Sequence, residues 1–384
     1  MGNLSRLIWL AFLAIALAAA MHRSGMSSSI AINSRAATAV QAELQSAVEA
    51  ELQPTLSAKR QPQNSTPASR KGINAGDLRR LSASALSAAV DDLVALGVSW
   101  VRMDFPWSEI ESTRGEFNMR GLDAAVRALG SRGIGVLAII DYAPSWANGG
   151  NGQMYPPTNA TDFATYAAFL VRHFAPMGVH TWEIWNEPNL KVYWATGADP
   201  GRYTQLLKAA YLAIKAADSS AIVITGGLAP AASSGGDLTP MDFLTGIYAN
   251  GGRGFFDAVA DHPYTYPAMP DDKSGGAYWW DAMNDLRAIM TAHGDADKSI
   301  WMTEYGAPTN GPAPARFVSE SNQAVMLTKA YTMSANYEWA GPLFWYALHD
   351  AGTSTTTVEN FFGILRFNGS RKPAYSALQR IPSH

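Results

Sequence analysis

The stretch Thr181-Trp182-Glu183-Ile184-Trp185-Asn186-Glu187-Pro188-Asn189 indicates the fold of this chain. Its first half alternates bulky apolar side chains with other residues, which is typical of a strand buried inside a protein. The strand must end at Asn186-Glu187-Pro188, because proline has no N–H group to donate to a sheet. Glu187 is therefore expected at the end of a buried strand, where an ionised carboxylate is costly unless it is paired or has a function.

Strand-like and helix-like segments alternate along the chain around this stretch. The strand-like runs are Lys71–Asn74, Ser99–Phe105, Gly135–Tyr142, Val179–Asn186, Ala221–Gly227, Phe256–Tyr264, Ser299–Tyr305 and Gly341–Leu348. The segments with a helical period are Ser84–Leu96, Met119–Gly130, Asp162–Phe174, Arg202–Ala217, Trp279–Ala292, Gln323–Tyr337 and Lys372–Ile381.

This alternation predicts parallel strands joined by right-handed crossovers. Repeated strand–helix units over residues 71–384 fit an α/β fold of the (β/α)8 TIM-barrel type, with a single catalytic domain. An open doubly wound sheet would usually carry a Gly-x-Gly-x-x-Gly turn after an early strand, and the sequence has none.

Two segments are expected before the barrel. Arg6 precedes the apolar run Leu7–Ala20, so residues 1–20 are predicted to be a secretory signal peptide. An uncleaved membrane anchor is the lesser alternative, because the run is shorter than the ~20 residues that span a bilayer. Residues 21–70 are rich in Ala, Ser, Gln and Pro and are predicted to be a flexible linker. We therefore expect a secreted or periplasmic protein.

The composition excludes several classes of function. Residues 1–70 carry six Lys/Arg and three Glu, so the remainder has 23 basic and 29 acidic side chains. An acidic domain without basic clusters is a poor candidate for binding nucleic acid. The chain has no cysteine, which excludes disulfides and thiolate chemistry. It has no His-Glu-x-x-His, no P-loop and no Gly-x-Ser-x-Gly motif. We expect no metal and no cofactor, and nothing in the barrel demands a second subunit, so a monomer is expected.

In such a barrel the chemistry belongs at the C-terminal ends of the strands. Polar and aromatic residues gather at these ends in the sequence. They are Arg102, Trp107, Tyr142, Trp146, Asn186, Glu187, His262, Tyr264, Glu304 and Trp345. Loops with only a structural role seldom collect this set, so a polar catalytic floor with aromatic walls is predicted.

Glu187 and Glu304 are the central pair of this set. Cleavage of a glycosidic bond needs one carboxylic acid to protonate the leaving oxygen and a second carboxylate as base or nucleophile. The alternative is that each glutamate caps the helix after its strand. Both glutamates end strands that are rich in aromatic residues, which favours catalysis.

Arg102, His262 and Tyr264 are predicted to support this pair. A buried arginine needs a carboxylate partner, so Arg102 could hold Glu304 ionised together with the Tyr264 hydroxyl. A structural bridge from Arg102 to Glu183 or Asp104 is the alternative. His262 is equally compatible with a substrate contact and with a core histidine bonded to a carbonyl.

The tryptophans suggest a carbohydrate ligand, because the flat faces of sugar rings pack on indole rings. The candidates for sugar contact are Trp107, Trp146, Trp185, Trp194 and Trp345. Trp279 and Trp280 are compatible with either sugar contact or core packing. Large aromatic side chains are more often packing residues, so each of these assignments is open.

Trp185-Asn186-Glu187-Pro188 and Thr303-Glu304-Tyr305-Gly306 together resemble the retaining glycoside hydrolases of clan A. The segments Trp182–Asn189, Ala143–Trp146, His262–Tyr264 and Gly363–Tyr375 are most similar to glycoside hydrolase family 39, which includes xylosidases, iduronidases and endoglycosidases that cut bacterial exopolysaccharides.

The resemblance covers about residues 70–384 and implies specific roles. Glu187 would be the acid/base, Glu304 the nucleophile, and Asn186 the partner of the sugar 2-hydroxyl. Arg102 and Tyr264 would hold Glu304. The clan often has a cis peptide after the tryptophan of the eighth strand, which places one at Trp345-Tyr346. The β-sandwich that several family 39 exoenzymes carry has no counterpart in this sequence, which favours the shorter, endo-acting type.

The sequence thus predicts a retaining glycosidase that acts on a β-linked polysaccharide through a covalent glycosyl-enzyme. In a retaining enzyme the two carboxyl groups lie ~5–5.5 Å apart, with a raised pKa for the acid and a lowered one for the nucleophile. Two alternatives stay open: a non-catalytic carbohydrate-binding envelope protein on the same barrel, and a transglycosylase.

Overall fold

The computed structural model describes residues 70–276 and 278–382. The predicted signal peptide, residues 1–20, and the predicted linker, residues 21–70, lie outside the described residues apart from Arg70. Within the described part of the chain, no helix is long and apolar enough to cross a bilayer.

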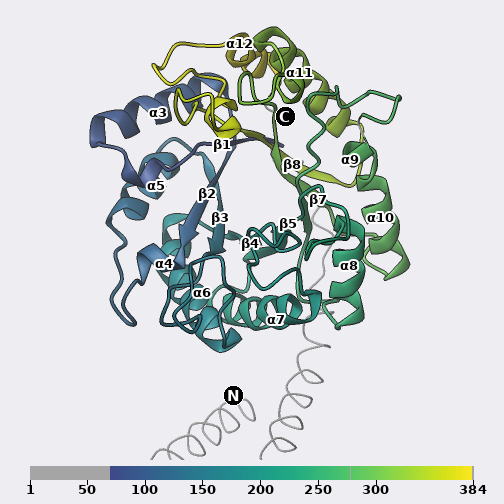
Figure 1. Ribbon diagram of the computed structural model, residues 1–384. Helices are drawn as coiled ribbons and strands as arrows, with labels where there is room; N and C mark the ends of the chain where they lie inside the picture. The colour runs from purple at the N-terminus through teal and green to yellow at the C-terminus, as the bar shows by residue number, and fades with distance from the viewer. Residues whose placement is uncertain (1–69, 277, 383–384) are drawn as a thin grey trace, which may run out of the picture. The chain divides into compact units, whose positions relative to one another are not determined.

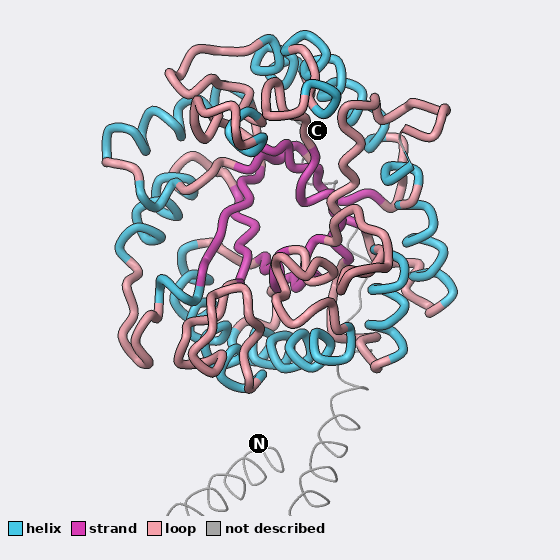
Figure 2. The backbone as a smooth tube through the Cα atoms, viewed as in Figure 1, coloured by secondary structure: helices cyan, strands magenta, loops and turns pink. Residues whose placement is uncertain are grey.

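Eight parallel strands form the centre of the fold and are ringed by helices (Figures 1 and 2). The strands are β1 (Lys71–Asn74), β2 (Trp100–Pro106), β3 (Gly135–Asp141), β4 (Thr181–Asn186), β5 (Ile222–Gly227), β6 (Val259–Asp261), β7 (Ile300–Tyr305) and β8 (Ala340–Tyr346). The helices are α3 (Ala83–Leu96), α4 (Trp107–Ile110), α5 (Arg120–Gly130), α6 (Ala160–Phe174), α7 (Pro200–Ala217), α8 (Pro240–Ala249), α9 (Tyr278–Asp281), α10 (Met283–Ala292), α11 (Glu320–Ala335) and α12 (Pro373–Arg380). Short 3-10 helices are η1 (Leu78–Arg80), η2 (Ala175–Met177), η3 (Pro314–Arg316) and η4 (Val358–Phe361).

The strands close into a barrel. Their hydrogen-bonded order is β5-β4-β3-β2-β1-β8-β7-β6. Isolated parallel bridges between Ile224 and Ala258 and between Leu228 and Asp261 join the two outer strands of this order. The predicted (β/α)8 TIM barrel is therefore confirmed.

Local sequence signals explain where several helices begin. The side chains of Ser82, Asn159, Asp199, Thr239 and Ser319 each accept a hydrogen bond from a backbone N–H in the first turn of the following helix. Such N-caps satisfy donors that the helix itself leaves unpaired. Thr239 also precedes Pro240, a residue favoured in a first turn. These two residues mark α8, which the helical period alone did not reveal.

Two predicted elements differ from the structure. The predicted strand Phe256–Tyr264 contains only the three residues of β6, because Pro263 has no N–H to donate and Tyr264 N–H bonds back to the carbonyl of His262 (2.7 Å). The predicted helix Trp279–Ala292 is divided at Ala282 into α9 and α10.

Side chains alternate between the barrel interior and the layer under the helices. The interior is filled by a small apolar cluster that includes Leu137, Ile224, Trp301 and Phe344. A larger cluster packs the outer face of the strands against the helices. This alternation decides which residues at the strand ends face the cavity.

Candidate active site

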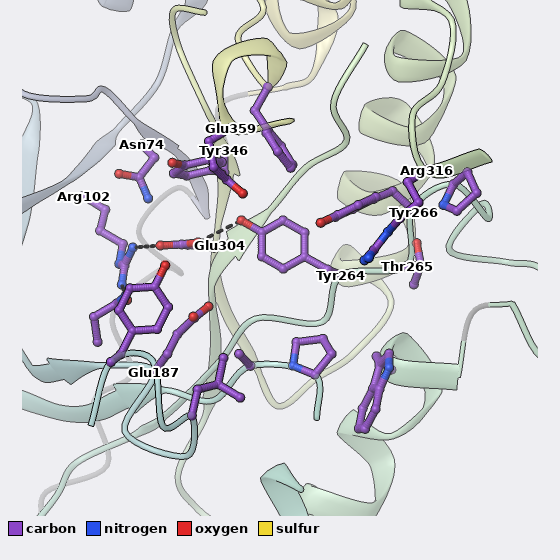
Figure 3. Close-up of a pocket in the computed structure, with 18 of the residues that line it drawn as sticks. Asn74, Arg102, Glu187, Tyr264, Thr265, Tyr266, Glu304, Arg316, Tyr346 and Glu359 are labelled. Carbon is purple, nitrogen blue, oxygen red and sulfur yellow. Dashed lines mark hydrogen bonds and ion pairs between the residues drawn. The ribbon is translucent and has the colours of Figure 1, made fainter. Parts of the chain in front are cut away.

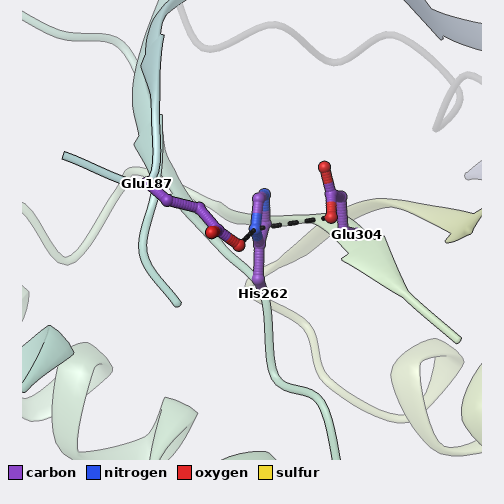
Figure 4. Close-up of side chains that lie close together, drawn as sticks. All are labelled: Glu187, His262 and Glu304. Carbon is purple, nitrogen blue, oxygen red and sulfur yellow. Dashed lines mark hydrogen bonds and ion pairs between the residues drawn. The ribbon is translucent and has the colours of Figure 1, made fainter. Parts of the chain in front are cut away.

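Two glutamates meet at the C-terminal end of the barrel. Glu187 follows β4 and Glu304 lies in β7. The Nδ1 atom of His262 lies 2.8 Å from Oε1 of Glu187 and 3.7 Å from Oε2 of Glu304 (Figure 4). One carboxylate oxygen of Glu187 and one of Glu304 lie within 4.8 Å of each other. This distance suits the close carboxyl pair of a retaining glycosidase, since the inverting arrangement needs ~6.5–9.5 Å.

An unusual backbone turns Glu187 into the cavity. Consecutive residues of a strand point to opposite faces, yet Asn186 and Glu187 both line the same cavity. The φ angles of Trp185 (70°) and Glu187 (44°) lie in the left-handed region, which residues other than glycine rarely adopt. The N–H of Glu187 bonds to the carbonyl of Gly227 (3.1 Å) and helps to hold this conformation.

Arg102 connects the buried floor of the cavity to Glu304. Its side chain is almost completely buried, and its Nη1 atom donates to Oε1 of Glu304. Nε and Nη2 donate to the two oxygens of Glu183 (2.7 and 3.0 Å), and Nη2 also donates to Oδ1 of Asn186 (2.9 Å). Arg102 therefore holds Glu304 and also forms the structural bridge to Glu183, so both alternatives drawn from the sequence apply together.

Tyr264 holds Glu304 from the other side. Its hydroxyl donates to Oε2 of Glu304 over 2.8 Å (Figure 3). Burial alone would raise the pKa of Glu304, but the charges of Arg102 and of protonated His262 and the hydrogen bonds from Tyr264 and Arg102 lower it below its ordinary value. Glu304 is thereby kept ionised.

Glu187 has the opposite electrostatic environment. Burial raises the pKa of Glu187 above its ordinary value, and this outweighs the lowering that the charged form of His262 brings through its hydrogen bond. The two shifts agree with the directions expected from the sequence for an acid and a nucleophile. Two adjacent carboxyl groups whose pKa values are pushed apart form an acid/base arrangement.

His262 lies behind the two glutamates and has no exposed surface. A Cβ atom on Gly227 would lie 2.0 Å from Nε2 of His262, so only glycine leaves room for the ring. The histidine contacts Glu187 and Thr303, whose hydroxyl lies 3.1 Å from Nε2. The ring is buried, as predicted for a core histidine, but its partners are Glu187 and Thr303 and not a carbonyl. Its burial argues against the alternative of a substrate contact.

The glutamates open into a cavity of about 860 Å³, within the size range of ligand pockets. Most of its walls come from loops that follow the strands. Its lining includes Asn74, Arg102, Asp104, Tyr142, Asn186, Glu187, Tyr193, Tyr264, Tyr266, Trp279, Glu304, Arg316, Tyr346 and Glu359. Figure 3 shows Arg102 on the left and Arg316 and Tyr266 on the right, with Glu304 and Tyr264 between them. Tyr346 and Glu359 lie above Glu304 in this view.

The family model described as "Cellulase (glycosyl hydrolase family 5)" matches residues 63–346 of this chain. The chain belongs to that family. Its barrel is thus a clan A glycoside hydrolase domain of the retaining type, and the clan predicted from the sequence is confirmed. Among curated proteins, no sequence matches the chain.

Solved structures of glycoside hydrolases share the fold of this family 5 chain. One is a family 39 glycoside hydrolase from Bacteroides cellulosilyticus WH2, with 24% identity, a TM-score of 0.65, and coverage of 81% of this chain and 63% of that one. A monomeric beta-xylosidase from Caulobacter crescentus CB15 has 20% identity, a TM-score of 0.58, and coverage of 82% and 68%. GH5_18 from Streptomyces cattleya, in complex with GlcNAc, has 18% identity, a TM-score of 0.61, and coverage of 83% and 82%. The chain thus spans less than two thirds of the length of the Bacteroides enzyme, and these likenesses show the fold alone.

All five tryptophans predicted to contact sugar lie outside the cavity lining of this family 5 domain. Trp107 is fully buried, stacks on Tyr166 and donates to Glu111 (2.7 Å). Trp146 is partly buried and donates to the carbonyl of Glu111 (2.9 Å). Trp345 has no exposed surface, because alternation in β8 directs it toward the helix layer. Trp185 and Trp194 are also fully buried.

The cavity is also lined by residues that were not predicted from the sequence. Tyr346, one residue after Trp345, faces the cavity, and the non-proline cis peptide follows it at Tyr346-Ala347 instead of following Trp345. Asn74 ends β1, so its place at a strand end was a usable signal. Arg316 and Glu359 lie in η3 and η4, within the loops after β7 and β8, where strand-end reasoning did not reach.

Glu187, His262 and Glu304 have donor atoms close enough to one another to share a metal ion. The Nδ1 atom of His262 is, however, already hydrogen-bonded to Glu187, and Glu304 is already neutralised by Arg102. These contacts favour an acid/base pair, and we assign the three residues no ion.

Proposed function

We propose that this protein is a retaining endo-glycosidase that cleaves a β-linked polysaccharide through a covalent glycosyl-enzyme. The observation that carries the proposal is the carboxyl pair of Glu187 and Glu304. One oxygen of each lies within 4.8 Å of the other, and their pKa values are shifted in opposite directions. A protonated acid beside an ionised carboxylate is what the first step of retaining hydrolysis requires.

In the proposed mechanism, Glu187 protonates the glycosidic oxygen while Glu304 attacks the anomeric carbon. Arg102 and Tyr264 orient Glu304 and hold its charge before the attack. Glu187, now a carboxylate, takes a proton from water, and this water releases the sugar from Glu304. Asn186 is proposed to bind the 2-hydroxyl of the sugar, since its Oδ1 atom is held by Arg102 at the edge of the cavity.

The cavity supports a carbohydrate ligand that is longer than one sugar. Tyr193, Tyr266 and Trp279 line it together with the two glutamates. Aromatic rings offer flat apolar faces to sugars, and they come here from the segments that follow β4 and β6. We propose internal cleavage on this basis. We also propose that the protein acts as a monomer and is exported through its N-terminal segment, as the sequence predicts.

A screen of reducing ends released from xylans, β-glucans, mannans, galactans and bacterial exopolysaccharides tests the activity. We expect one substrate to be cut into several oligosaccharides, with retention of anomeric configuration in the first product. Glu304→Gln is the control and is expected to lose turnover while it keeps the thermal unfolding temperature of the wild type.

The proposal is wrong if Glu304→Gln retains near-native turnover. Binding of oligosaccharides by the wild type without any release of reducing ends would instead favour the non-catalytic alternative. Products longer than the substrate, formed with excess acceptor sugar, would favour transglycosylation.

A further inference from the structure

A chain of buried polar groups lies behind the two glutamates and joins Glu183 to Glu187. The hydroxyl of Thr303 donates to Oε1 of Glu183 over 3.3 Å and lies 3.1 Å from Nε2 of His262. Nδ1 of His262 in turn lies 2.8 Å from Oε1 of Glu187. Glu183, His262 and Thr303 all have no exposed surface. Their hydrogen-bonding groups must therefore be satisfied by neighbouring groups of the protein.

Counting protons along this chain identifies the tautomer of His262. Glu183 is paired with Arg102 through both of its oxygens, and its Oε1 atom also accepts from the N–H of Gly227 (3.0 Å). A carboxylate can only accept, so the single hydroxyl proton of Thr303 points to Glu183. The Thr303 oxygen must then accept from His262, which places a proton on Nε2. In the neutral imidazole, Nδ1 is consequently left without a proton.

We propose that Glu183 and Thr303 set the tautomer of His262, and that the neutral form of His262 thereby keeps Glu187 protonated in the resting enzyme. The bare Nδ1 atom accepts the proton of a neutral Glu187, whereas an ionised Glu187 would place its charge against the nitrogen lone pair. Thr303 and His262 are positioning residues in this scheme, which rests on the acid/base role proposed for Glu187.

The same arrangement serves the second half of the reaction. After Glu187 has given its proton to the leaving oxygen, its carboxylate faces the lone pair of Nδ1. This favours the return of a proton to Glu187, and the attacking water supplies it. One proton leaves Glu187 and one returns in each cycle, so His262 keeps its own proton on Nε2 throughout.

Several charged groups around His262 act on the same proton. Glu187 and Glu304 face its ring from β4 and β7, Arg102 lies behind Glu304 on β2, and Asp261 precedes it on β6. Burial lowers the pKa of His262, but the two glutamates raise it above its ordinary value. A test must therefore report which nitrogen carries the proton, and not only whether the ring is charged.

Nitrogen-15 NMR of histidine-labelled protein makes that distinction and needs no substrate. The chain has seven histidines, so the His262 signals are assigned by their absence in His262→Asn. In the wild type above the titration of the ring, we expect Nε2 to be protonated and Nδ1 to be bare. In Thr303→Val the acceptor is lost, and we expect the neutral ring to move its proton to Nδ1. Thr303→Ser keeps a hydroxyl and is expected to retain the wild-type tautomer.

The pH profile of kcat/KM gives a second readout, measured on the substrate that the reducing-end screen identifies. Its alkaline limb reports the essential acid of the free enzyme. An Nδ1–H tautomer would stabilise the ionised Glu187, so we expect the limb of Thr303→Val to move to lower pH by about 0.5–1 unit, the size of one hydrogen bond. Thr303→Ser is expected to keep the limb in place.

A neutral His262 that carries its proton on Nδ1 in the wild type overturns the proposal, even if Thr303→Val fails to fold. An unmoved tautomer and alkaline limb in Thr303→Val, with activity lowered equally at every pH, also overturns it and leaves Thr303 as a packing residue. The absence of any hydrolysis would instead contradict the proposed function, while the tautomer measurement still stands.

Discussion

Removal of the Tyr264 hydroxyl tests how Glu304 is kept ionised. In Tyr264→Phe, the 2.8 Å hydrogen bond to Oε2 of Glu304 is lost while the ring and its packing remain. A hydrogen bond to a charged group contributes ~1.5–3 kcal/mol, and one pKa unit corresponds to ~1.4 kcal/mol. The pKa of Glu304 is therefore expected to rise by about 1–2 units, although Arg102 continues to hold the other oxygen.

The sign of the effect on activity follows from the role of Glu304 as a nucleophile. Glu304 must be ionised to attack, and its pKa sets the acid limb of the kcat/KM profile. The acid limb of Tyr264→Phe is expected to move to higher pH by about 1–2 units. Activity should therefore fall most at low pH and recover as the pH rises.

Tyr305→Phe is the matched control. Tyr305 adjoins Glu304 in the chain, is fully buried, and its hydroxyl bonds to Thr265 (2.8 Å) instead of to Glu304. Its removal should leave the acid limb in place. An acid limb that stays at the wild-type pH in Tyr264→Phe would refute the electrostatic role assigned to this hydroxyl.

Two further predictions concern stability and substrate contact. Glu183→Gln breaks a fully buried pair with Arg102 and should lower the free energy of unfolding by about 3–5 kcal/mol in urea denaturation, and a loss below ~1 kcal/mol would contradict the pairing. Trp279→Ala should raise KM with little change in the free energy of unfolding, because Trp279 lines the cavity. Trp345 is fully buried, so Trp345→Ala should instead lower the free energy of unfolding by ~3–5 kcal/mol. Equal effects of the two variants on KM would contradict these placements.

The sequence was sufficient to predict the barrel and its central pair of glutamates. Parallel strands place their C-terminal ends at one face of the barrel. Residues that end these strands therefore come together whatever course the connecting loops take. Glu187 and Glu304 end β4 and β7 and accordingly come together. The proline after Glu187 marks its place at the strand end in the sequence itself. These features depend on local order along the chain, which the sequence records directly.

The aromatic walls of the cavity could not be predicted in this way. Strand alternation buries Trp345 and exposes Tyr346 to the cavity, and a prediction that is wrong by one residue exchanges the two faces. Trp279, Arg316 and Glu359 reach the cavity from loops and short helices whose course no periodic pattern describes. Their positions depend on how separate segments pack.

The network behind the glutamates was decided by the tertiary structure alone. In the sequence, Glu183 is one carboxylate in a buried strand and Thr303 is an ordinary strand residue. In the barrel, Thr303 lies between Glu183 and His262, and His262 lies against Glu187. The sequence determined which residues end the strands, because that is a property of neighbours along the chain. Only the closed barrel decided which of their protons are shared, because it brings groups from β4, β7 and the end of β6 within hydrogen-bonding distance.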